Sequence, residues 1–311
     1  LLISAVLLSA VLSFSGPVLD SANSFYSSGE FEKAIFYYKK GVSVGENKAL
    51  CYFNLANAYF SLDSVPQSII YYRACITYAP EFFRGHLNLA IAYYTLDDYG
   101  SAIASVKRAL LYNPEDKRSM LILATCYRRL EAYSYAAPIF EKLILADPEM
   151  DEPYIALGEI YRDLEDPVEA ARWLNRYPET GPNRKYVLLL LSDIYQKKED
   201  FGRAVFYLRK VFEKDKSQKW TYYRIVLLQQ KMDNDFMALE TVKRGVELFP
   251  DFAELALLGG NIAMKLKDYS QAERLYRKAA DNGSSTALIG LDNIRDIRKA
   301  MLEGAFQGDE G

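Results

Sequence analysis

The chain has 311 residues, of which half are hydrophobic and 14% aromatic, and its formal net charge is −3. This balance argues against a nucleic-acid or anionic-membrane surface, because both need a concentrated basic excess. The chain has three cysteines without CxxC spacing, which argues against a zinc site and a redox motif. It has a single histidine, His86, which argues against a catalytic nucleophile paired with a histidine base. We therefore expect no cofactor, no metal and no enzymatic activity.

The first 14 residues, LLISAVLLSAVLSF, carry no charge and are followed by Ser15, Gly16 and Pro17. This apolar run has the length of the hydrophobic region of an export signal and is too short to span a bilayer. We therefore expect a truncated export signal or anchor, which would place the rest of the chain in the periplasm or another extracytoplasmic compartment. Any membrane association would then occur through this segment only. The alternative is a hydrophobic helix that caps the next element, which is compatible with a cytoplasmic location.

From Ser15 onward, a small residue recurs every 34 positions without insertion, at Ala34, Ser68, Ala102, Ala136, Ala170, Ala204, Ala238 and Ala272. Two helices that touch need a small residue at their contact, because a larger side chain would push the backbones apart. The fixed period therefore predicts one helix pair repeated eight times over 15–286, with repeats that start at residues 15, 49, 83, 117, 151, 185, 219 and 253.

Other columns of the repeat support this phase. Counted from each start, the eleventh position is aromatic in the first six repeats, and prolines close five repeats at Pro80, Pro114, Pro148, Pro182 and Pro250. With the small residue at the twentieth position, this pattern resembles the tetratricopeptide repeat. The resemblance implies an all-α, right-handed superhelical solenoid of antiparallel helix pairs, and we interpret the chain as an exported bacterial member of that family.

After the last repeat, residues 287–303 place apolar side chains on one helical face, at Leu288, Leu291, Ile294, Ile297 and Met301. A single amphipathic helix in this position covers the final hydrophobic face of a repeat array. We therefore expect a C-terminal capping helix over 287–303 and a flexible tail over 304–311.

The resemblance also implies that the first helix of each repeat lines a concave, peptide-binding groove. Some members clamp the terminal carboxylate of a peptide with two asparagines and a basic residue. In this chain the same positions are occupied by Asn23, Asn54 and Arg84, and one repeat later by Asn57, Asn88 and Arg118. We expect these amides to be exposed and to pair with the backbone of an extended peptide. The lysine of that clamp is replaced here by Leu19 or Phe53. The alternative to peptide binding is that the asparagines are solvated or cap neighbouring helices.

Two further candidate sites lie on the same helices. Arg128, Arg129 and Arg162 could receive the acidic groups of a partner, and the alternative is an ion-pair network with nearby Glu159, Asp163 and Asp193. Farther along, the sixth and seventh repeats contribute an aromatic wall typical of interface anchors, formed by Tyr186, Leu189, Leu190, Trp220, Tyr223 and Leu227. This wall could instead hold a neighbouring helix or the N-terminal segment.

We expect Cys51, Cys75 and Cys126 to be buried and free, although a Cys51–Cys75 bridge is an alternative in an oxidising compartment. The leading interpretation of the whole chain is a scaffold that binds a protein or peptide without performing chemistry. The alternative is a structural module of the cell envelope that assembles into homo-oligomers.

Overall fold

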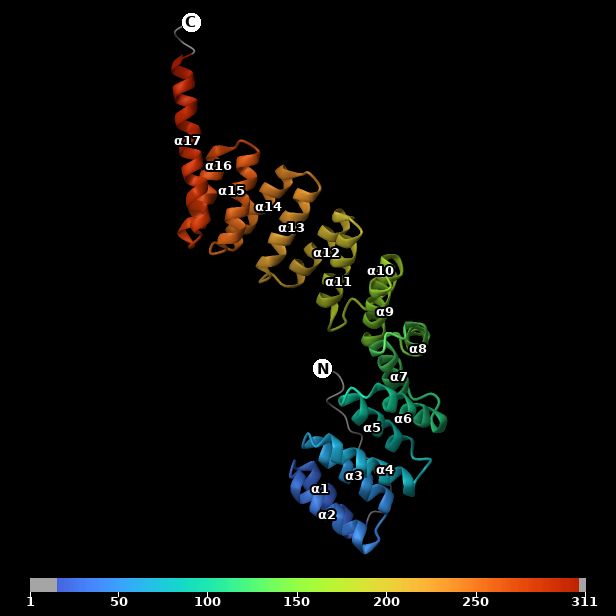
Figure 1. The fold of residues 1–311 in the computed structure, drawn as a ribbon. Coiled ribbons are helices and arrows are strands. Elements are labelled where there is room, and N and C mark those ends of the chain that lie inside the picture. Colours follow the sequence, from blue (N-terminus) through green and yellow to red (C-terminus); the bar gives the residue numbers. More distant parts are fainter. Residues whose placement is uncertain (1–15, 308–311) are drawn as a thin grey trace. The chain divides into compact units, whose positions relative to one another are not determined.

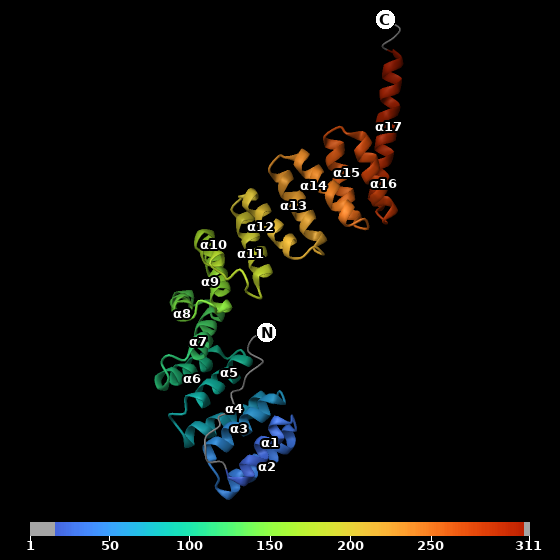
Figure 2. The ribbon, with the colours of Figure 1, turned by 180° about the vertical axis from the view of Figure 1, so that it is seen from behind.

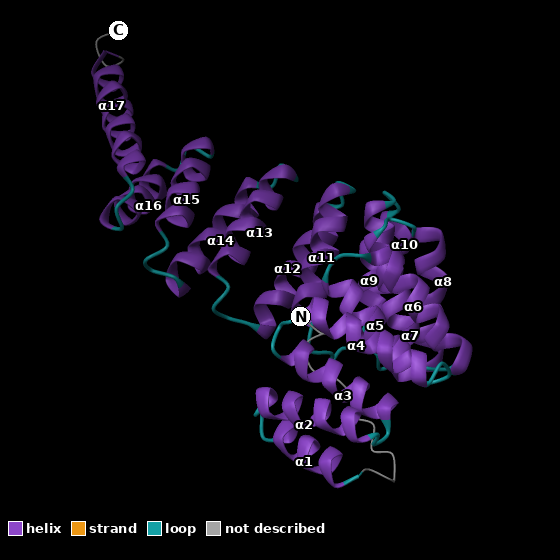
Figure 3. Cartoon of the chain, turned by 60° about the horizontal axis from the view of Figure 1, so that its bottom comes forward, coloured by secondary structure: helices purple, strands orange, loops and turns teal. Residues whose placement is uncertain are grey.

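The computed structural model describes residues 16–307, and of 302–307 only the backbone. Within this range the chain forms seventeen α-helices and no strand (Figures 1 and 3), so the all-helical prediction is confirmed. The helices are α1 Pro17–Ser27, α2 Phe31–Val44, α3 Lys48–Ser61, α4 Val65–Tyr78, α5 Phe83–Thr95, α6 Tyr99–Tyr112, α7 Lys117–Arg129, α8 Tyr133–Ala146, α9 Asp151–Asp163, α10 Pro167–Asn175, α11 Arg184–Lys197, α12 Phe201–Lys214, α13 Lys219–Lys231, α14 Asp235–Leu248, α15 Ala253–Lys265, α16 Tyr269–Asp281 and α17 Ser285–Gln307.

The small residue of each repeat lies in its second helix, α2, α4 and every second helix up to α16. All eight of these residues, from Ala34 to Ala272, are completely shielded from solvent. Burial of a side chain no larger than a methyl or hydroxymethyl group lets the first helix approach the second closely. The 34-residue period of the sequence is therefore the spacing of helix-pair contacts.

A left-handed residue turns the chain between the two helices of each repeat. Gly29 has this conformation in the first repeat, and seven non-glycine residues adopt it with φ between 53° and 60° in the others, namely Asp63, Asp97, Glu131, Glu165, Glu199, Asp233 and Lys267. The residue that follows often caps the second helix: the Asp98 carboxylate, for example, accepts from the backbone N–H of Ser101 at 3.0 Å. Five of the eight turns thus combine a residue in the left-handed conformation with a side-chain cap of the second helix.

The chain divides into two compact units, the first ending at Ile160 and the second starting at Tyr161. In the first unit the helices from α1 to α8 enclose buried residues such as Phe53, Tyr72 and Val106. In the second unit a core around Val242 and Leu255 continues into α17 through Ala287 and Ile294. Figure 2 shows the helices of both units from behind.

The connection from α10 to α11 departs from the regular pattern. Helix α10 has only nine residues, whereas α12 and α14 have 14 each. The chain beyond it folds around the buried ring of Tyr177, whose hydroxyl accepts from the backbone N–H of Asn183 at 2.9 Å, and the Arg184 guanidinium donates to the Tyr177 carbonyl at 3.2 Å. The stretch Gly181–Asn183 is thus part of a hydrogen-bonded loop.

The C-terminal helix α17 is longer than expected. It runs for 23 residues to Gln307, so the prediction that it ends at residue 303 and that 304–307 belong to a flexible tail is wrong. One glycine, Gly304, interrupts otherwise helix-compatible residues there and costs only about 1 kcal/mol. Near its start, Gly290 lies so close to Tyr276 that an added Cβ would be 2.6 Å from the ring.

Residues 1–14 lie outside the described part of the chain, as do 308–311. Between residues 16 and 307, no helix combines the length and the apolarity that crossing a membrane requires. The three cysteines are buried and free, so the structure contains no Cys51–Cys75 bridge.

Candidate functional site

The asparagines of the predicted clamp form a buried hydrogen-bond network in the first unit. The Asn57 Oδ1 accepts from the Tyr72 hydroxyl at 2.6 Å and from the Asn88 Nδ2 at 3.0 Å. The Asn23 Oδ1 accepts in the same way from Tyr38 at 2.9 Å and from Asn54 at 3.0 Å. Each of these oxygens therefore has two donors, the usual capacity of an amide carbonyl.

Burial of these amides corrects the expectation that they are exposed. Asn54, Asn57 and Asn88 retain at most 4% of their accessible surface, and Asn23 is half-buried. Asn23 and Asn57 each accept from a tyrosine hydroxyl of the second helix, and Asn54 and Asn88 each donate to the asparagine of the preceding repeat. The sequence held a signal for this pairing, since a tyrosine follows each of Asn23, Asn57 and Asn261 by 15 residues and bonds to it.

Arg84 and Arg118 occupy equivalent positions on α5 and α7 and are half-buried. Neither guanidinium forms an ion pair or hydrogen bond with a described residue; that of Arg84 lies 5.8 Å from the centroid of the Phe83 ring. Burial lowers the pKa of Arg118, against the opposing effect of the Asp116 carboxylate. A partly desolvated cation that has no ion-pair partner favours the approach of an anion.

The other predicted arginines already have partners. The Arg128 Nη1 lies 3.0 Å from the Glu159 Oε2, and the Arg129 Nε donates to the Tyr94 hydroxyl at 3.3 Å. In the second unit, Arg162 pairs with Asp163 at 2.9 Å. The ion-pair interpretation therefore describes Arg128 and Arg162 in this structure.

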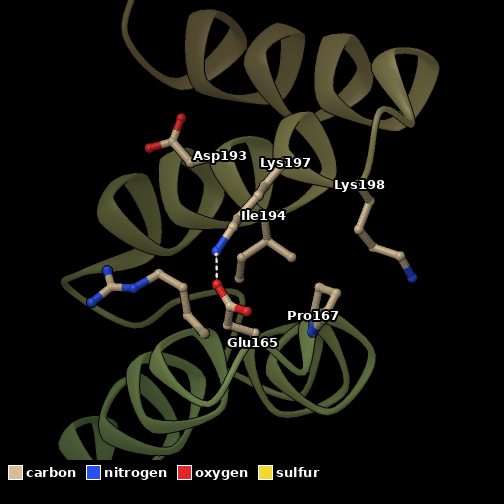
Figure 4. Close-up of a pocket in the computed structure, with 7 residues that line it drawn as sticks. Glu165, Pro167, Asp193, Ile194, Lys197 and Lys198 are labelled. Carbon is tan, nitrogen blue, oxygen red and sulfur yellow. Dashed lines mark hydrogen bonds and ion pairs between the residues drawn. The ribbon is translucent and has the colours of Figure 1, made fainter.

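A pocket of about 380 Å³ lies beside Arg162 in the second unit (Figure 4). The Lys197 Nζ reaches across it to the Glu165 Oε1 at 3.0 Å, and the Asp193 carboxylate pairs with Arg224. Ile194 and Pro167 supply apolar lining. Because the carboxylates are paired with these cations, the pocket presents little uncompensated negative charge to a ligand.

Of the residues of the aromatic wall, Tyr186 on α11 and Trp220 and Leu227 on α13 are exposed, whereas Leu189 and Tyr223 are half-buried and Leu190 is buried. Trp220 is 53% exposed. Its ring contacts that of Tyr223 edge to face, at a centroid distance of 5.6 Å. Exposure combined with fixed geometry makes this wall suited to burial by a partner.

The Phe252 ring packs against the rings of Trp220 and Tyr223, and the sequence did not identify it as part of this site. It is buried at the N-cap of α15, with its ring centroid 4.8 Å from that of Trp220 and 6.2 Å from that of Tyr223. The Lys219 ammonium lies 5.0 Å from the Phe252 centroid. The only signal for this role is the position of Phe252, which ends one repeat and begins the first helix of the next.

His86 is buried as well, with its Nε2 2.8 Å from the Pro80 carbonyl and its ring stacked on Tyr112. Among the described residues there is no group of three or more histidines, cysteines or carboxylates that could hold a metal ion.

Family models of the tetratricopeptide repeat match residues 49–82, 87–151, 127–194 and 186–217, which together span more than half of the chain. A comparison with curated protein sequences found no match.

Several solved structures share the fold. The C-terminal part of a tetratricopeptide repeat protein from Cytophaga hutchinsonii is 13% identical with a TM-score of 0.55, over 88% of this chain and 99% of its own. A tetratricopeptide repeat protein from Parabacteroides merdae is 14% identical with a TM-score of 0.52, over 80% and 99% of the two chains. MamA from Desulfovibrio magneticus, from residue 41 to its end, is 20% identical with a TM-score of 0.52, over 55% and 97%.

Proposed function

Because this chain belongs to the tetratricopeptide repeat family, we propose that it is a scaffold that binds a protein or peptide and performs no chemistry. The observation that carries the proposal is the aromatic wall, which exposes Trp220 and Tyr186 on the first helices of two successive repeats. The wall needs an apolar or aromatic side chain of the partner to cover it.

The geometry of Trp220 favours binding in two ways. Its edge-to-face contacts with Tyr223 and Phe252 hold the ring in place before a partner arrives, so little side-chain entropy is lost on binding. The exposed part of the indole then buries apolar surface at about 25 cal/mol per Å². Large, pre-oriented aromatic rings are the residues that dominate binding energies in protein interfaces.

In the first unit, Arg84 and Arg118 provide a second recognition element. Their unpaired guanidinium groups suit an acidic side chain or a terminal carboxylate of the partner. The asparagines beside them contribute mainly by fixing the register of α1, α3 and α5, since their carbonyl oxygens are occupied by tyrosine and asparagine donors.

Site-specific photo-crosslinking tests where the partner lies. A photoreactive phenylalanine analogue at Leu227 of the full chain should crosslink to a partner that co-purifies with it, because Leu227 belongs to the wall and is 38% exposed. The same analogue at Phe206 on α12, which is 51% exposed, is the matched control. Crosslinks from Phe206 and none from Leu227 would place the partner away from the wall.

Self-assembly is the second candidate, and helix α17 favours it. Its side chains Leu288, Ile289 and Met301 are each more than half exposed, so α17 keeps an apolar surface after packing on α16. Sedimentation velocity of the full chain distinguishes the two functions: a monomer that binds its partner supports the scaffold, whereas a stable homo-oligomer disrupted by Ile289→Glu supports the self-assembly module.

A further inference from the structure

The second unit contains another pocket, of about 330 Å³, between α12, α13 and α14. Tyr222 and Ile225 of α13 line it, and they lie on the opposite face of that helix from Trp220 and Leu227. We infer that this pocket is a binding site for a small aromatic anion, meaning a flat apolar ring system that carries a carboxylate or phosphate. The inference concerns a different surface from the aromatic wall and does not depend on it.

The floor of the pocket is apolar and partly open to solvent. The rings of Phe212 and Tyr222 meet at right angles with centroids 4.7 Å apart, and both residues are half-buried beside the buried Ile225. Gly245 on α14 permits this arrangement, because a Cβ there would lie 3.0 Å from the Cδ1 of Tyr222 and 2.5 Å from Leu255. The floor can therefore receive the face or edge of another aromatic ring.

The rim of the pocket is basic. Arg209, Lys216 and Arg244 line it against one carboxylate, that of Glu213. Neither arginine forms an ion pair or side-chain hydrogen bond with a described residue, and the Lys216 ammonium lies 4.7 Å from the Phe212 centroid. Three cations against one carboxylate thus leave an excess of positive charge beside the apolar floor.

Two acids near this rim are engaged mainly with lysines, although the charge of Arg244 also acts on Glu240. The Asp215 carboxylate accepts from the Lys185 ammonium at 2.8 Å, and Glu240 pairs with Lys243 at 2.6 Å.

These features select the ligand class. A guanidinium group forms two parallel hydrogen bonds with a carboxylate or a phosphate, and two such groups on α12 and α14 can hold one acid group between them. The ring system of the same molecule would lie over Phe212 and Tyr222. The pocket volume is at the lower end of the range for small-molecule sites, so one or two fused rings fit.

Calorimetric titration of the full chain tests the inference. The probes are 1-naphthyl phosphate and 1-naphthoate, with inorganic phosphate and uncharged 1-naphthol as comparisons. We expect one or both naphthyl anions to bind more tightly than either comparison compound, because only they use the floor and the rim together. The naphthyl anion that binds more tightly shows whether the site prefers a phosphate or a carboxylate.

The double variant Arg209→Gln/Arg244→Gln should weaken that binding by about tenfold or more, as expected for lost charge-assisted hydrogen bonds. Arg73→Gln/Arg108→Gln removes the same charge from two exposed arginines on α4 and α6 in the first unit, and should leave the affinity unchanged. Trp220→Ala should also leave it unchanged. Equal binding of 1-naphthol, equal effects of the two double variants, or loss of binding in Trp220→Ala would each overturn the inference.

Discussion

The Nδ2 of Asn88 donates a hydrogen bond to the Oδ1 of Asn57, 3.0 Å away on the preceding first helix. Both side chains are 2% exposed, and the Tyr72 hydroxyl donates to the same oxygen at 2.6 Å. One buried amide therefore joins the two helices of its own repeat and the first helix of the next. These asparagines stabilise the stacking of repeats.

Replacement of Asn57 by alanine should lower the free energy of unfolding by about 1–3 kcal/mol, because it leaves the Tyr72 hydroxyl and the Asn88 amide buried without partners. Urea denaturation measures the change. Asn261→Ala is the matched control, because Asn261 is exposed and accepts only from Tyr276, at 2.7 Å. This variant should lose less free energy of unfolding than Asn57→Ala. Equal losses in the two variants would contradict a structural role for the Asn57–Asn88 bond.

The helix pairs could be predicted from the sequence because their determinants recur at fixed spacing. The column from Ala34 to Ala272 identified the helix-pair contacts, and every member is fully buried. The roles of the asparagines could not be read in this way. A column shows which helix face a side chain occupies, but the partners of Asn57 come from a second helix and from a neighbouring repeat. The same limit hid Phe252, which ends the repeat that contains Trp220 and contacts its ring from the N-cap of α15.

Gln229 interrupts the aromatic eleventh column and is 1% exposed. Neither its Nε2 nor its Oε1 has a hydrogen-bond partner among the described residues. Gln229→Leu should therefore raise the free energy of unfolding by about 1–3 kcal/mol, since it removes a buried, unpaired amide. Thermal and urea denaturation test this against Gln230→Leu, a half-buried neighbour that should change little. Destabilisation by Gln229→Leu would show that the amide is needed.

Ala136→Leu should cost about 1–3 kcal/mol, because three extra carbon atoms must enter the contact between α7 and α8, where Ala136 is fully buried. Ala104→Leu on α6 makes the same chemical change at an exposed position and should be nearly neutral. The comparison of their urea midpoints checks the phase of the repeat. Unchanged midpoints in Ala136→Leu would argue against a tight helix contact there.

Burial raises the pKa of Cys51 to about 11 and those of Cys75 and Cys126 to about 12, from an ordinary value of 9.0. Because the native state favours the neutral thiols, their contribution to stability is complete below pH 9 and falls as the pH rises towards 11 to 12. At pH 8 the native chain should react slowly with a thiol-specific disulfide reagent, and the unfolded chain should release all three thiols rapidly. Rapid labelling of the native chain would refute the burial of these thiols.

The proposed scaffold is tested most directly by calorimetry, which measures the affinity of the Trp220→Ala variant for the partner that co-purifies with the full chain. Phe236→Ala is the control, because Phe236 is 74% exposed on α14, a second helix. We predict that Trp220→Ala weakens binding by about tenfold or more, without changing the thermal midpoint, and that Phe236→Ala binds as the original chain does. Full affinity in Trp220→Ala, or loss of affinity in Phe236→Ala alone, would contradict a binding site on the aromatic wall.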